Sequence, residues 1–93
     1  MKAIWNDIIV AESEDTRLVE RNHYFPMEDI HEEYFLPSNS HSRCPWKGKA
    51  SYFHLKTEGK LEEDAAWYYP AASYAAKPIE NYVAFGEEVE ITE

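Results

Sequence analysis

A single cysteine, Cys44, stands among basic residues in the middle of the 93-residue chain. His41 precedes it by three positions, Arg43 lies directly before it, and Lys47 follows by three positions. Cationic neighbours favour the reactive thiolate form of a cysteine, and a nearby histidine can serve as its base. Cys44, His41 and Lys47 are therefore the candidate catalytic residues. The alternative is that Cys44 is a small buried apolar residue, as free cysteines commonly are.

The charge of the chain changes sign around this cysteine. The whole sequence holds 18 acidic and nine basic residues, a net charge of -9, whereas residues 41–60 hold five basic residues and one acidic residue. Because a positively charged cleft concentrates anions, we predict that residues 38–52 form a pocket for a small anion such as a phosphate or carboxylate. Lys47 would supply charge, and Gly48 would let the backbone approach the ligand. The alternative is that these cations are solvated or pair with nearby carboxylates.

Aromatic side chains and one carboxylate complete the predicted pocket. Tyr52, Trp67 and Tyr69 fall on predicted strands, where they either pack in the core or form a wall that could stack a ring or a sugar. Glu20 follows an apolar pair of residues, and it either faces water or is buried against a cation such as Lys47. The predicted ligand-binding residues are Glu20, Tyr24, Ser38, Arg43, Gly48, Tyr52, Trp67 and Tyr69.

The spacing of His41 and Cys44 could place two ligands on one metal ion. His23 or His54 could add a third ligand, but nothing in the sequence marks the remaining ones. The three glycines form no phosphate-binding glycine-rich loop. We therefore predict no metal and no cofactor. A lone cysteine also forms no internal disulfide, which suits a reducing compartment.

Short strands must position these residues, because the hydrophobic pattern mostly has a period of two. Residues 3–5 and 8–10 flank Asn6-Asp7, which is typical of a hairpin turn. Residues 38–48 are polar and turn-forming, so we expect a long loop there. Further strands are predicted at 16–21, 24–26, 34–36, 50–56 and 64–69, with a last hairpin of 82–85 and 89–91 around Gly86 and single helical turns at 27–30 and within 73–82.

The length and composition predict one small domain, residues 1–93, with a mostly β fold. A complex bent sheet or barrel-like sandwich of about eight short strands, with one or two helical turns, accounts for the pattern. The negative net charge disfavours duplex nucleic acid and anionic membrane surfaces as partners. No stretch approaches the ~20 apolar residues of a membrane span, and Asn6-Asp7 interrupts the first apolar run, so we expect a cytoplasmic protein.

The segment SNSHSRCPWKGKASY at residues 38–52 resembles the signature of domain-of-unknown-function family 427. That signature is a Ser-x-x-(His/Arg)-(Ser/Thr)-x-Cys-Pro-aromatic-Lys-Gly-x-Ala-x-aromatic run. The resemblance extends over most of the chain, from about Ile4 to Ile91. Its other blocks are Glu20, Tyr24-Phe25-Pro26-x-x-Asp29-Ile30, Ala65-Ala66-Trp67-x-Tyr69-Pro70 and Ile79-x-x-Tyr82-Val83-Ala84-Phe85.

The resemblance implies a small, mostly β, Mss4-like domain that is widespread in bacteria and has no established activity. Members are sometimes labelled nucleotidyltransferase-like. Such enzymes generally need a Gly-Ser turn and paired aspartates that hold magnesium on a triphosphate. This chain has neither a Gly-Ser nor an Asp-x-Asp sequence.

Three functions remain open on the sequence. The first is a small anionic ligand bound in a pocket at residues 38–52. The second is an enzyme that uses Cys44 as a nucleophile or redox thiol. The third is a non-catalytic interaction module, a monomer or homodimer, that binds another protein or a second copy of itself through its aromatic and acidic residues 67–93.

Overall fold

Short antiparallel strands make up most of the chain, and the computed structural model describes residues 1–93. The mostly β fold predicted from the hydrophobic pattern is confirmed, with nine strands where about eight were expected. Three short 3-10 helices join them: η1 (Met27–Asp29), η2 (Glu32–Tyr34) and η3 (Tyr74–Ile79). The strands are β1 (Lys2–Trp5), β2 (Ile8–Glu12), β3 (Arg17–Val19), β4 (Asn22–Pro26), β5 (Phe35–Cys44), β6 (Gly48–Thr57), β7 (Lys60–Tyr68), β8 (Tyr82–Phe85) and β9 (Glu90–Thr92).

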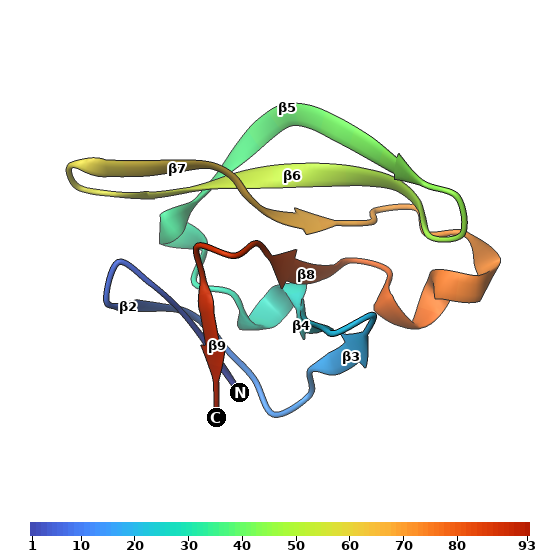
Figure 1. Cartoon of the computed structure of the whole chain (residues 1–93), viewed down its shortest axis with the longest axis horizontal. Coiled ribbons are helices and arrows are strands. Elements are labelled where there is room, and N and C mark those ends of the chain that lie inside the picture. The colour runs from blue at the N-terminus through green and yellow to red at the C-terminus, as the bar shows by residue number, and fades with distance from the viewer.

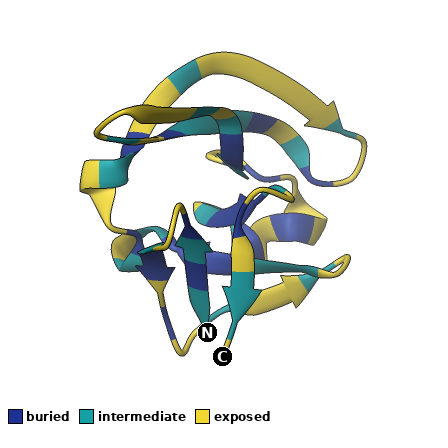
Figure 2. Ribbon diagram, turned by 60° about the vertical axis from the view of Figure 1, so that its left-hand side comes forward, coloured by how far each residue is buried: buried dark blue, intermediate teal, exposed yellow.

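The strands form two antiparallel sheets. The small sheet has the order β2-β1-β9, and the large sheet has the order β3-β4-β8-β7-β6-β5. Figure 1 shows the long strands β5, β6 and β7 across the top, with the small sheet at the lower left. Lys2 on β1 lies opposite Thr92 on β9, so the two ends of the chain lie side by side (Figures 1 and 2).

Two hairpins turn through pairs of residues with positive φ. Asn6 and Asp7, with φ of 53° and 61°, join β1 to β2 and confirm the predicted turn. Glu20 and Arg21, with φ of 51° and 70°, join β3 to β4. Such turns are favoured because their twist matches that of the flanking strands. The strand predicted at residues 16–21 is therefore shorter than expected, since β3 ends at Val19 and Glu20 begins the turn.

The predicted long loop at residues 38–48 is also wrong, because strand β5 runs through most of it. β5 lies at the edge of the large sheet, where a proline is tolerated, and Pro37 pairs opposite Phe53. Most of β5 faces water, so its polar sequence carries no alternation that would mark a strand. Only residues 45–47 form the turn to β6.

The predicted last hairpin does not form. Strand β8 pairs with β4 and β7, whereas β9 crosses to the small sheet and pairs with β1. The crossing places Val89, which is buried, and Ile91, which is partly buried, against the core between the two sheets. The burial of these side chains thus selects a partner strand that local sequence does not indicate.

Two groups of buried side chains lie on opposite faces of the large sheet. Neighbours on one strand separate accordingly: Phe25 and Val83 face the small sheet, while Tyr24 and Ala84 face η3. Figure 2 shows the buried residues inside these layers and exposed residues along β5. We call the second group the η3-side core, which consists of Tyr24, Ala50, Tyr69, Ala72, Ala76, Ile79 and Ala84.

Candidate functional site

Lys47 is the charged side chain that the fold buries, with 6% of its surface exposed. Its ammonium group forms an ion pair with the carboxylate of Glu20. Lys47 belongs to the turn between β5 and β6, and Glu20 belongs to the turn between β3 and β4. A buried ammonium without a partner is strongly destabilising, so Lys47 needs the Glu20 carboxylate. The pair thereby holds the tips of the two hairpins together.

Aromatic rings surround the Lys47 ammonium. Its Nζ lies 4.9 Å from the centroid of the Trp46 ring and 6.0 Å from that of the Tyr69 ring. Trp46 Nε1 also donates a hydrogen bond of 3.4 Å to the second carboxylate oxygen of Glu20. Lys47 and Trp46 therefore bind both oxygens of Glu20, and the rings attract the ammonium through their π faces.

The electrostatic environment holds these groups in their ordinary charge states. The hydrogen bond from Lys47 lowers the pKa of Glu20. Burial by itself would lower the pKa of Lys47, but the Glu20 hydrogen bond, together with nearby Tyr24, Tyr69 and Cys44, raises it. Burial raises the pKa of Tyr69 to about 12. Lys47 is therefore a fixed cation at neutral pH and not a neutral amine nucleophile.

Gly48 fixes the same hairpin tip against the segment that leads into η3. The Ser73 amide donates to the Lys47 carbonyl at 2.9 Å, and the Ser73 hydroxyl donates to the Trp46 carbonyl. Gly48 has a φ of 112°, and a Cβ there would lie 3.4 Å from the Ala71 carbonyl oxygen and the Ser73 nitrogen. These are ordinary contact distances, so the requirement for glycine comes from its φ, which side chains rarely adopt.

The structure places Cys44 and His41 on opposite faces of β5. The register from His41↔Ser51 to Cys44↔Gly48 is continuous, and side chains alternate between faces along such a strand. The Cys44 side chain, partly buried, packs against the η3-side core. His41 Nδ1 instead lies 3.2 Å from the Ala50 carbonyl oxygen. The predicted thiol and base are therefore not brought together.

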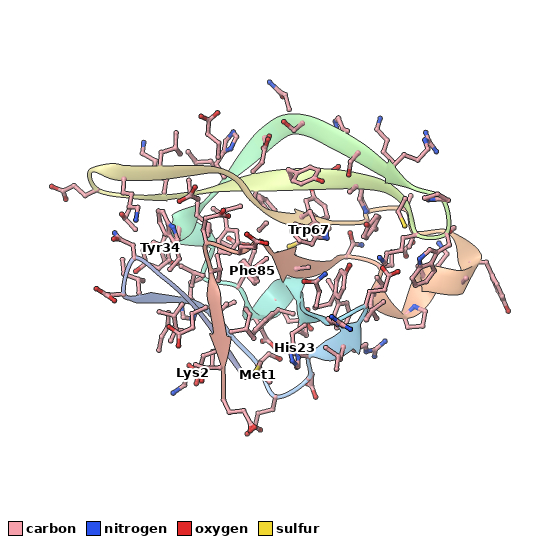
Figure 3. All side chains as sticks on the ribbon, in the orientation of Figure 1. Met1, Lys2, His23, Tyr34, Trp67 and Phe85 are labelled. Atoms are coloured by element: carbon pink, nitrogen blue, oxygen red, sulfur yellow. The ribbon has the colours of Figure 1, made fainter.

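The histidines that could serve as metal ligands also lie apart from one another. His23 lies on β4 beside β3, where it pairs opposite Leu18 (Figure 3). His54 Nδ1 accepts a hydrogen bond of 3.0 Å from the Asp64 amide. No three histidine, cysteine, aspartate or glutamate side chains gather closely enough to hold a metal ion.

Ser38 belongs to a bend in the large sheet. Asp64 on β7, with a φ of 52°, accepts hydrogen bonds from Ser38 Oγ at 2.5 Å and from Ser40 Oγ at 2.8 Å. These bonds lower the pKa of Asp64. The register between β5 and β6 shifts between Pro37 and His41, in the segment that contains Ser38 and Ser40. Ser38 is therefore engaged with the protein and lies outside the group around Lys47.

The remaining predicted ligand-binding aromatics share the η3-side face. Tyr24 and Tyr69 are buried in that core, and Tyr52 and Trp67 pack against it. The rings of Tyr52 and Trp67 are 6.3 Å apart and inclined by 48°. The Tyr52 hydroxyl lies 2.8 Å from Ser42 Oγ. Trp67 is partly buried and lies opposite Ala84 of β8 (Figure 3). The structure thus gathers Glu20, Tyr24, Cys44, Lys47 and Tyr69, of which Tyr24, Lys47 and Tyr69 are buried, Cys44 is partly buried and Glu20 is exposed.

An open hollow of about 260 Å³ lies beside the β5–β6 hairpin, lined by His41, Ser42, Arg43 and Lys49. Of these, His41 and Arg43 were predicted site residues, whereas Ser42 and Lys49 were missed. Lys49 pairs directly opposite Arg43, so the two cations are neighbours on one face. Recognising β5 as a strand would have revealed this pairing from the sequence.

Residues 1–93 match the family described as a domain of unknown function (DUF427). The match spans the whole sequence, and the chain belongs to this family. It matches no curated protein. None of the helices in the structure has the length and apolar character that crossing a membrane requires.

Proposed function

We propose that the domain binds a small anionic ligand, through a phosphate or carboxylate group, in the hollow beside the β5–β6 hairpin. The observation that carries the proposal is the pairing of Arg43 with Lys49. The two side chains are exposed, lie directly opposite each other, and form no ion pair within the protein. Like charges in this position destabilise an antiparallel pair, so an anion between them would offset a cost of the folded state.

The other two lining residues lie on different faces of β5. His41 shares the face of Arg43 and Lys49, whereas the Ser42 side chain lies on the opposite face, with its Oγ 2.8 Å from the Tyr52 hydroxyl. His41 Nδ1 lies 3.2 Å from the Ala50 carbonyl oxygen, which leaves Nε2 as the other polar atom of the ring. A protonated His41 would donate from both nitrogens and add a third cation to the hollow.

The local charge favours an anion here in spite of the net charge of -9. No aspartate or glutamate occurs between Glu33 and Glu58, a stretch that includes the whole of β5 and of β6. The other hollow of the molecule, of about 560 Å³, carries five acidic side chains and would repel an anion. It is lined by Met1, Lys2, Glu12, Ser13, Glu14, Asp15, Asp29 and Glu93.

A titration followed by amide chemical shifts tests the proposal. Inorganic phosphate and succinate, each added at constant ionic strength, are expected to shift the amide signals of residues 41–43 and 49 in a saturable way. Arg43→Gln with Lys49→Gln should abolish these shifts, and Lys56→Gln, an exposed cation elsewhere on β6, should leave them unchanged. Shifts that persist in the double variant, or no saturable shift with either anion, would overturn the proposal.

A further inference from the structure

Strand β5 is an open edge of the large sheet. It pairs with β6 on one side and with no strand on the other. In Figures 1 and 2 it forms the outer rim of the molecule, and no other segment runs along its free side. Such an edge presents unpaired backbone amide and carbonyl groups that can accept a further strand.

Only one half of this edge is suited to pairing. Around the bend, Pro37 lacks an amide proton, and the Ser40 amide already donates to Ser38 Oγ at 3.0 Å. From His41 to Cys44 the register with β6 is regular, and residues 41–43 are exposed. Proline and irregular pairing protect edges from added strands, whereas the second half of β5 carries neither feature.

The charge of this half selects the partner. Arg43 on β5 and its neighbour Lys49 on β6 project on one face next to the free edge. Two copies of the chain paired through β5 would bring these four cations together, which disfavours a second copy. A strand whose side chains carry carboxylates on that face would instead place them beside Arg43, at the spacing of a cross-strand pair.

We propose that residues 41–44 of β5 bind an extended acidic peptide segment as an additional strand of the large sheet. Backbone hydrogen bonds would supply affinity, and carboxylates at the Arg43–Lys49 hollow would supply selectivity. The inference rests on the proposed function, since it places the carboxylate group that the hollow binds on the side chain of a peptide. It makes the domain a recognition module for acidic extended segments.

Fluorescence anisotropy with a defined probe tests this proposal. The probe is the amidated peptide Thr-Glu-Val-Glu-Val-Glu-Thr with a fluorescent label at its N-terminus, and it carries its glutamates on one face of a strand. We expect saturable binding at low ionic strength that weakens by about tenfold or more when the glutamates are replaced with glutamine. A peptide with the same charges but N-methylated central amides should bind similarly weakly, because it lacks the amide protons that pair with a strand edge. Bound peptide should also slow hydrogen exchange at residues 41–44.

Variants and outcomes separate the two proposals. Arg43→Gln should weaken the peptide by about tenfold, and the matched Lys56→Gln variant should not. Equal binding of the N-methylated and unmethylated peptides, together with binding of free phosphate, overturns the peptide proposal and leaves the anion site standing. A peptide that binds without slowing exchange at residues 41–44 also overturns it. Absence of binding by both peptide and phosphate overturns both proposals.

Discussion

Lys47 and Glu20 form an ion pair between two hairpin tips that are 27 positions apart in the chain. The partners differ in their contact with water: the side chain of Lys47 is 7% exposed and that of Glu20 is 55% exposed. Loss of one partner is therefore not equivalent to loss of the other. An unpaired glutamate would be solvated, whereas an unpaired Lys47 would remain between Trp46 and Tyr69 without a counterion.

This asymmetry predicts the ranking of two variants. Lys47→Met keeps an apolar stem in the buried position and should reduce the free energy of unfolding by about 1 kcal/mol or less. Glu20→Gln should reduce it more, because the ammonium then stays buried beside a neutral amide. The double variant should recover most of the loss caused by Glu20→Gln. Urea unfolding followed by circular dichroism measures all three, and a Lys47→Met variant less stable than Glu20→Gln would contradict the prediction.

The lowered pKa of Glu20 predicts a dependence of stability on acid. Its pKa in the folded protein is below the ordinary value of 4.5, so the unfolded chain takes up the proton first as the pH falls. The stabilisation is complete above pH 4.5 and is lost as the pH falls through the folded pKa.

Glu20→Gln isolates this contribution from those of Asp64 and Glu80, whose pKa values are also lowered. The difference in melting temperature between the wild type and this variant should be largest near pH 7 and should shrink as the pH approaches 3. A difference that stays constant over this range would mean that the charge of Glu20 contributes nothing.

Gly48 and Gly59 form a matched pair for a test of backbone conformation. Both have positive φ, 112° and 82° respectively, and the value at Gly48 lies farther from the left-handed region that other residues can adopt. Gly59→Ala should cost about 1 kcal/mol of stability. Gly48→Ala should cost about 2 to 3 kcal/mol, because its φ is the less tolerable for a side chain. Equal costs in urea unfolding would show that the hairpin tip adjusts its backbone easily.

The packing of Cys44 against the η3-side core predicts slow chemical modification. Iodoacetamide should label the thiol much more slowly in the native protein than in urea, since the side chain is partly buried. His41→Ala should leave the native rate unchanged, because the two side chains lie on opposite faces of β5. Mass spectrometry of quenched samples gives both rates. Fast native labelling that depends on His41 would restore the hypothesis of a catalytic thiol.

Local signals in the sequence were sufficient for elements that depend on a few adjacent residues. The Asn6-Asp7 turn and the single helical turns after Pro26 and near Pro78 follow from the conformational preferences of those residues. These features need no knowledge of which strands pair.

The rest depended on pairing between distant segments. β5 is polar because it is an exposed edge, so its composition resembled that of a loop. With no strand predicted there, the alternation that separates His41 from Cys44 could not be applied, and the opposition of Arg43 and Lys49 could not be foreseen. A pair between Glu20 and Lys47 was one of the alternatives open on the sequence, but the burial of Lys47 depends on how the two hairpins meet.

The pairing of β1 with β9 sets the order in which the molecule can form. The small sheet joins the first strand of the chain to the last, so its completion closes a loop of nearly the whole sequence. Closing so long a loop loses chain entropy before the stabilising contacts can form. Folds dominated by such distant pairings therefore form slowly, in roughly milliseconds to seconds. We therefore expect the β5–β6–β7 meander to form early and the pairing of β1 with β9 to form last, as the slow step of folding.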